Sequence, residues 1–224
     1  GLFRDEADIK NSPIQTFGIY EAGDIKYKDV NGDGRIDVDD QVPLSYDNYP
    51  RLMYGFGGEF RYKNLTFNIL FKGIGKKDFF YTSEESGFGY YPFLYGETGN
   101  VLSIVANSKN RWIPASYSGD PSTENPNARF PRLSYGKNGN NTQKSTFWKA
   151  NGQYLRLQEI SIGYNLKLKA LSKVGISSID LQLVGQDLYV WDKIGGLWDP
   201  EQTTKNGRAY PIPATYSLQM YINF

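Results

Sequence analysis

The densest group of oxygen-bearing side chains in the sequence lies between residues 29 and 40. Aspartate or asparagine stands at the first, third, fifth, ninth and twelfth positions of this segment. Gly34 is predicted to make the sharp turn at the sixth position, and Ile36 to be the apolar anchor at the eighth. The spacing is that of an EF-hand calcium loop, in which a short segment surrounds one Ca²⁺ ion with oxygen atoms. The predicted ligands are Asp29, Asn31, Asp33, Arg35 through its backbone carbonyl, Asp37 and Asp40.

This calcium-type loop admits three interpretations: a regulatory switch, a structural clip that orders an external loop, or an aspartate-rich turn without metal. Four carboxylates held close together repel one another, and a divalent cation relieves that repulsion. Asp40 stands where glutamate is usual, as in the calcium loops of dockerin-like modules. We favour the structural clip, because extracellular modules bind Ca²⁺ at about 10⁻⁴–10⁻³ M and stay occupied outside the cell.

The rest of the sequence offers no catalytic constellation. It contains neither histidine nor cysteine, which excludes Ser-His and Cys-His nucleophile pairs, the usual zinc sites and disulfide frameworks. Paired carboxylates occur at 84–85 and 199–201, and without a placed partner we interpret them as solvated loop charges rather than a glycosidase pair. The glycine-rich run 55–58 lacks the helix and the Lys-Ser/Thr that complete a phosphate-binding loop. We therefore predict that the protein is not an enzyme.

Composition narrows the class of protein further. Lys and Arg total 25 against 24 for Asp and Glu, so no basic surplus is available to bind nucleic acid. No apolar run approaches the 18 or so residues of a transmembrane helix. The 18 Tyr, 13 Phe and 24 Gly favour β structure with long loops. Gly1 opens a polar stretch without a leader, and we expect the chain to be a processed or excised piece of a longer protein.

Five segments alternate apolar and polar residues with a period of two, which predicts strands with one apolar and one polar face. They span residues 51–63, 65–73, 154–168, 177–189 and 215–224. The phase of the third segment slips near Gln158-Glu159, which predicts a β-bulge there. Lys63-Asn64 has the length of a hairpin turn, and asparagine tolerates a positive φ.

The connections between these strands alternate in length. Residues 1–50, 74–152 and 190–213 form long loops, the second with a short helix expected within 101–111, whereas 63–64 and 169–175 are short. Long external loops and short periplasmic turns are typical of outer-membrane β-barrels, and strands of about 9–11 residues cross a bilayer. We therefore predict an all-β chain with an external calcium-loop region, 1–50, and transmembrane strands in 51–224. Five strands cannot close such a barrel, so we expect the other strands to come from a part of the protein outside this sequence.

Several segments resemble one family. Residues 23–34, Gly-Asp-Ile-Lys-Tyr-Lys-Asp-Val-Asn-Gly-Asp-Gly, are similar to a segment of the SusC/RagA-type TonB-linked outer-membrane transporters. Further similarities follow in order at 50–56, 154–164 and 185–188, and the last strand also resembles the terminal strand of that family. The resemblance covers the whole chain, and the combination of segments makes it specific.

The resemblance implies a larger assembly than this chain. The family has a barrel of about 22 antiparallel strands in the outer membrane, a plug that couples to TonB, and a SusD/RagB-like surface lipoprotein that acts as a lid. It thus implies that this chain is the C-terminal five strands of a transporter for oligosaccharides or oligopeptides, with TonB contacted through the missing N-terminal part. Two alternatives stay open: a passive porin-like channel, or an extracellular calcium-stabilised glycan-binding module or glycosidase domain.

Five aromatic residues complete the set of candidate sites. Trp112, Trp148, Trp191 and Trp198 lie in or beside the predicted external loops, where they would contact substrate or lid, or else serve a loop core or an interfacial aromatic belt. Phe224 ends the apolar face of the last strand. In the family that it resembles, the terminal aromatic residue is part of the signal that the barrel-assembly machinery reads. Outer-membrane lipid is a further expected partner of the strands.

Overall fold

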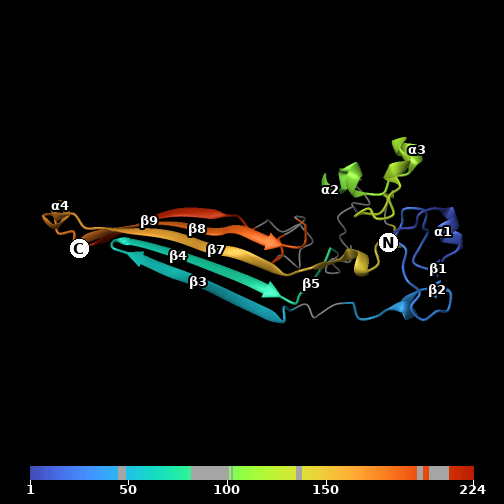
Figure 1. Cartoon of the computed structure of the whole chain (residues 1–224), viewed down its shortest axis with the longest axis horizontal. Helices are drawn as coiled ribbons and strands as arrows, with labels where there is room; N and C mark the ends of the chain where they lie inside the picture. The colour runs from blue at the N-terminus through green and yellow to red at the C-terminus, as the bar shows by residue number, and fades with distance from the viewer. Residues whose placement is uncertain (45–48, 82–100, 102, 135–137, 196–198, 202–211) are drawn as a thin grey trace. The chain divides into compact units, whose positions relative to one another are not determined.

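The computed structural model describes residues 1–44, 49–81, 101, 103–134, 138–195, 199–201 and 212–224 (Figure 1). The chain divides into two compact units. One comprises residues 1–45, 80–150 and 204–206, and the other comprises 46–79, 151–203 and 207–224. The first is called the loop unit below and the second the sheet unit. Residues 80–150, predicted as a loop between strands, thus group with the N-terminal region.

The sheet unit is built on five antiparallel strands. They are β3 (Leu52–Tyr62), β4 (Leu65–Gly75), β7 (Tyr154–Leu166), β8 (Ser178–Asp192) and β9 (Thr215–Asn223). Each pairs with the next in chain order, which makes a simple up-and-down meander (Figure 1). All five predicted strands are confirmed, and so is the all-β class of the fold.

The register separates the two faces of the sheet by chemistry. Because side chains alternate along a strand, residues paired across all five strands share one face. One such row consists of Phe60, Phe67, Ile162, Leu183 and Leu218. The next row, on the opposite face, consists of Arg61, Thr66, Gly163, Gln182 and Gln219. Five separate amphipathic strands thereby become one sheet with a continuous apolar face and a continuous polar face.

The predicted bulge in the third strand is confirmed. The register between β7 and its neighbours shifts between Leu157 and Glu159, which leaves Gln158 outside the regular pairing. On β8, Leu157 pairs with Tyr189 and Glu159 with Gln186, so two residues of β8 oppose Gln158. Because β7 and β8 are irregular at the same place, the two strands continue to pair on the far side of the bulge. The prediction that the fourth strand ends near Tyr189 is therefore wrong, since β8 runs on to Asp192.

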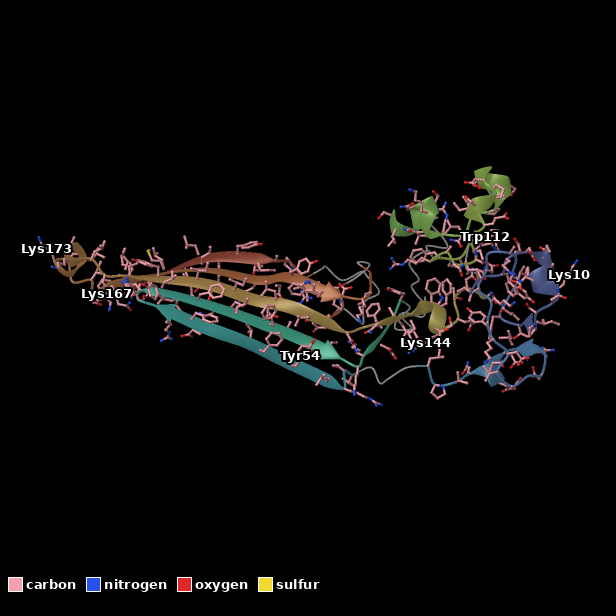
Figure 2. The ribbon with its side chains drawn as sticks, in the orientation of Figure 1. Lys10, Tyr54, Trp112, Lys144, Lys167 and Lys173 are labelled. Carbon is pink, nitrogen blue, oxygen red and sulfur yellow. The ribbon has the colours of Figure 1, made fainter. Side chains whose placement is uncertain are left out.

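The two short connections differ in how they turn the chain. The predicted hairpin turn between β3 and β4 is present, and its positive φ, 53°, falls on Lys63 and not on Asn64. Between β7 and β8 the helix α4 (Lys169–Ser172) leads to Gly175, whose φ of 82° suits glycine. Within the sheet, Gly73 leaves room for the Tyr54 ring, which an added Cβ would overlap (Figure 2).

The loop unit consists of short elements joined by irregular backbone. The elements near the N-terminus are α1 (Glu6–Lys10), β1 (Ile14–Gln15), β2 (Arg35–Ile36), which pairs with β1 in parallel, and the 3₁₀ turn η1 (Val38–Asp40). Later elements are α2 (Ser103–Ala106), η2 (Ser108–Asn110), α3 (Ala115–Ser118), η3 (Pro121–Thr123) and η4 (Thr146–Trp148). The strands β5 (Asp78–Phe80) and β6 (Lys149–Asn151) form a separate two-stranded sheet. The helix predicted within 101–111 is confirmed by α2 and η2.

The loop unit has its own buried core. Its largest apolar members are Phe3, Ile25, Trp112, Phe130 and Trp148. None of the helices in the described part of the chain has the length and apolar character needed to span a membrane.

Candidate functional site

The calcium-type loop is closed by hydrogen bonds from its own backbone amides. The carboxylate of Asp29 accepts from the N–H of Gly32 at 2.6 Å and of Gly34 at 2.8 Å. Asp40, at the other end, accepts from the N–H of Val30 at 2.7 Å and of Asp37 at 2.9 Å. The first and twelfth positions thus hold the loop in a tight turn, and the amide of Val30 is the main cause that lowers the pKa of Asp40.

The middle of the loop is fixed in a similar way. Asn31 and Asp33 each accept from a backbone N–H two residues further along, at 3.0 and 2.8 Å. Asp37 caps η1 by accepting from the N–H of Asp39. Ile36, the predicted apolar anchor, is buried and lies on β2. The loop therefore has the predicted turn and the predicted anchor.

Metal binding itself is a separate matter from loop conformation. In the part of the chain that the structure describes, no three acidic side chains are grouped so as to hold a metal ion. The carboxylates instead bond to loop amides, a conformation that also leaves lone pairs free on each carboxylate. The donor set is the hard oxygen set that Ca²⁺ prefers, including the Asn31 amide and the Arg35 carbonyl. Ca²⁺ binding stays a prediction.

A buried polar network lies in the same unit as this loop, and it was not predicted as a site from the sequence. Asp24 is fully buried and accepts hydrogen bonds from Arg132 at 3.0 Å and from the Asn141 amide at 2.7 Å. Asn138 donates to the same carboxylate at 3.2 Å. A buried carboxylate needs such partners, because an unpaired charge away from water is very costly. Asp24 thereby ties residues 23–27 to a segment more than a hundred positions later.

Only glycine fits at position 23, directly before this carboxylate, for steric reasons. Gly23 has φ of 86°, and an added Cβ would overlap the ring of Trp112, labelled in Figure 2. The motif residues of segment 23–27 therefore serve the internal structure of the loop unit. Their signal in the sequence was the resemblance of that segment to the transporter family, which pointed to the motif without giving its role.

The four tryptophans occupy different environments. Trp112 and Trp148 are buried, 4% and 1% exposed, and Trp148 donates from Nε1 to the backbone carbonyl of Asn141 at 2.9 Å. Both side chains pack in the core of the loop unit, so little of their surface is accessible to a substrate or lid. Trp191 is half exposed on the apolar face of β8, with its ring centroid 4.7 Å from that of Tyr189. Trp198 lies outside the described residues. Phe224 follows β9 and is exposed.

The apolar face of the sheet exposes large side chains on all five strands or beside their ends. Phe60, Leu183 and Leu218 are 65%, 52% and 75% exposed. Other exposed members of this face are Leu52, Phe56, Leu65, Ile162, Leu181, Met220 and Ile222. An apolar surface of this extent marks an interaction with lipid or with another apolar surface, since soluble monomers rarely expose one.

The polar face carries a second cluster that sequence reasoning misinterpreted. Arg156 of β7 donates from Nη2 to both carboxylate oxygens of Asp199, at 2.7 and 2.6 Å, and from Nε to Glu201 at 2.9 Å. Lys72 of β4 donates to Glu201 at 3.2 Å. The prediction that these two carboxylates are solvated loop charges is therefore wrong, because both are ion-paired with side chains of the sheet.

Comparison with solved structures defines the class of fold. The chain matches the RagAB peptide importer in its "open-open" state with a TM-score of 0.60 at 18% identity, over 85% of this chain and 19% of that one. The "closed-closed" state gives a TM-score of 0.59 at 20% identity with the same coverage. The chain therefore shares its fold, which includes a five-stranded antiparallel sheet, with part of that importer.

Sequence comparison extends the similarity to named relatives. The chain is 28% identical over 236 residues to TonB-dependent receptor P26 of Formosa agariphila, and 28% identical over 221 residues to receptor P3 of the same organism. These matches cover 100% and 92% of this chain, which spans only 22% and 20% of the relatives. No protein-family model matches. The chain is thus similar to a fragment of a SusC/RagA-type TonB-dependent transporter, and that resemblance is confirmed.

Proposed function

We propose that the sheet unit is part of the lipid-facing wall of a TonB-dependent transporter in the outer membrane, at its C-terminal end. The observation that carries this proposal is the segregation of apolar and polar residues onto opposite faces of one continuous sheet. In a membrane barrel the apolar face meets hydrocarbon and the polar face meets a wet lumen. A soluble sandwich would instead bury the apolar face against a second sheet.

Strand length supports the same proposal. An 11-residue strand such as β3 is about 36 Å long at about 3.3 Å per residue. At the tilt of about 35–45° that is usual in membrane barrels, it rises about 25–30 Å, which matches the apolar band of an outer-membrane protein. The strands are thus long enough to cross the bilayer.

Aromatic residues lie toward both ends of the apolar face. Tyr62 and Tyr164 both pair with Leu65, next to the β3–β4 turn. Tyr54, Tyr189 and Trp191 lie toward the opposite ends of their strands. Tyrosine and tryptophan favour the boundary between hydrocarbon and water, where the ring is apolar and its polar atom stays wet. The arrangement fits two aromatic girdles on one lipid-facing surface.

The names of the relatives support a proposal for the cargo and the partners of the full-length protein. The RagAB neighbours are, by name, peptide importers, and the curated relatives are TonB-dependent receptors. We propose that the full-length protein imports oligosaccharides or oligopeptides, with energy from TonB and with a SusD/RagB-like lipoprotein as a lid. The long loops that are predicted to be external would then be available to the lid and the incoming substrate.

The calcium-type loop has a structural task in this proposal. It contains β2 and η1, and Ca²⁺ would be held there by Asp29, Asn31, Asp33, Asp37 and Asp40 together with the carbonyl of Arg35. A bound ion would neutralise the carboxylates and hold the loop unit in one conformation at the cell surface.

Energised uptake is the test of the proposed function. Cells that express the full-length protein should take up labelled peptides or oligosaccharides only when TonB is present, and the protein should require detergent for extraction. A plug-less porin would conduct without TonB, and a soluble external module would be released without detergent. Either result would overturn the proposal.

A further inference from the structure

The ion cluster on the polar face is buried far more than surface salt bridges are. The side chain of Arg156 is 2% exposed, and that of Asp199 is 8% exposed. One guanidinium thereby binds two carboxylates that are two positions apart on the segment after β8. Charge-assisted hydrogen bonds from two nitrogens of one planar guanidinium give fixed geometry as well as attraction.

A third carboxylate faces the same guanidinium. Asp187 lies 3.9 Å from Nε of Arg156, at the irregularity where two residues of β8 oppose Gln158. Its φ is 53°, a conformation that aspartate tolerates better than most residues. The bulge thus places an acidic side chain beside Arg156 in addition to the two from the following segment.

We propose that Arg156, with Lys72, anchors the segment Asp199–Glu201 against the polar face of the sheet. This inference rests on the proposed function, in which the polar face lines the inside of the barrel. Residues 199–201 then lie in the lumen, fixed to the wall. Without the anchor, the same segment is free to move away from the wall toward the outside.

The energetic reason lies in the cost of separating buried charges. Removal of one partner leaves the others buried and unpaired, which is far more costly than loss of an exposed ion pair. If Arg156 is lost, Asp199 and Glu201 regain solvation by leaving the wall. Opening of the segment should therefore become much more frequent while the strands themselves stay paired.

Cysteine labelling tests the anchor in the full-length protein. This chain has no cysteine, and any elsewhere in the protein is replaced first. Pro200→Cys places a thiol between the two anchored carboxylates, at a buried position, and a membrane-impermeant maleimide reports its exposure in assembled barrels. Addition of Arg156→Leu should raise the labelling rate at least about tenfold. The pair Asp199→Asn and Glu201→Gln should raise it as well.

Matched controls separate the anchor from general destabilisation. Arg61→Leu removes an exposed arginine from the same face and should leave labelling of the thiol at position 200 unchanged. A thiol from Lys193→Cys, an exposed position, should label equally in all backgrounds. Equal labelling at position 200 with and without Arg156 in assembled protein would overturn the anchor. If Arg156→Leu fails to assemble, the Asp199/Glu201 pair decides alone. Failure of the parent protein to form a heat-modifiable membrane barrel would instead count against the proposed function.

Discussion

A pair of adjacent substitutions on β8 gives the sharpest test of the two-faced sheet. Leu183 lies on the apolar face, between Ile179 and Tyr189, and Gln182 lies beside it on the polar face. Leu183→Lys would place a charge in the hydrocarbon, whereas Gln182→Lys would place the same charge in the lumen. The two variants share strand, length and net charge, so only the direction of the side chain differs.

The expected difference in stability follows from the cost of a charge in lipid. Lysine near the middle of the bilayer destabilises a barrel by about 2–4 kcal/mol, and lysine facing the lumen by close to zero. At about 1.4 kcal/mol for each factor of ten, Leu183→Lys should lower the folding equilibrium constant about 30-fold to 700-fold. Gln182→Lys should lie near the parent value.

Reversible unfolding of the full-length barrel in liposomes, followed by heat-modified gel mobility, measures both variants. The assay reports the free energy of unfolding as the denaturant concentration is varied. Equal losses in the two variants, or a larger loss for Gln182→Lys, would refute the assignment of the apolar face to lipid. Either outcome would favour a sheet whose apolar face is covered by another layer of protein.

Three further predictions concern the loop unit. Gly23→Ala should destabilise it by about 2–4 kcal/mol, since the new Cβ meets Trp112 at an unfavourable φ, and hydrogen exchange of its amides measures the loss. Asp33→Ala should abolish Ca²⁺ binding in calorimetry and increase protease cleavage near the loop. Lys26 donates to Asp8 at 2.8 Å and lowers the pKa of that carboxyl to about 2, below its usual 3.8. The ion pair of Lys26 and Asp8 therefore stabilises the folded state in full above pH 3.8. The loss of stability that Lys26→Met causes should vanish as the pH falls through about 2.

Each of these three has a clear contrary result. Gly119→Ala, at a similar φ but with open space around it, isolates the backbone cost, and an equal loss there would remove the steric argument for Gly23. Unchanged metal content in Asp33→Ala would remove the calcium site. A deficit of Lys26→Met that persists at about pH 2 would show that the lysine acts by packing and not by charge.

The role predicted for Phe224 in barrel assembly stays a prediction. Its test is deletion of the residue in the full-length protein, which should lower the amount of assembled barrel in the membrane. Normal levels would contradict the prediction.

Much of the sheet could be predicted from the sequence because its signals are local. Alternation of period two identified all five strands, and a slip of phase identified the bulge at Gln158. The calcium-type loop was equally local, and the burial of Ile36 agrees with its predicted place as anchor. Turn details were less accessible, since Lys63 rather than Asn64 takes the positive φ once the hairpin register is set.

Contacts between distant segments were decided only by the tertiary structure. Arg156 and Asp199 are 43 positions apart, and Asp24 and Asn141 are 117 apart. No periodicity links such residues, because their partnership depends on which loop folds onto which surface. The sequence by itself determined which side chains share a face of each strand. The fold alone decided which charges are buried together, since a charge leaves water only where the packed chain supplies its partner.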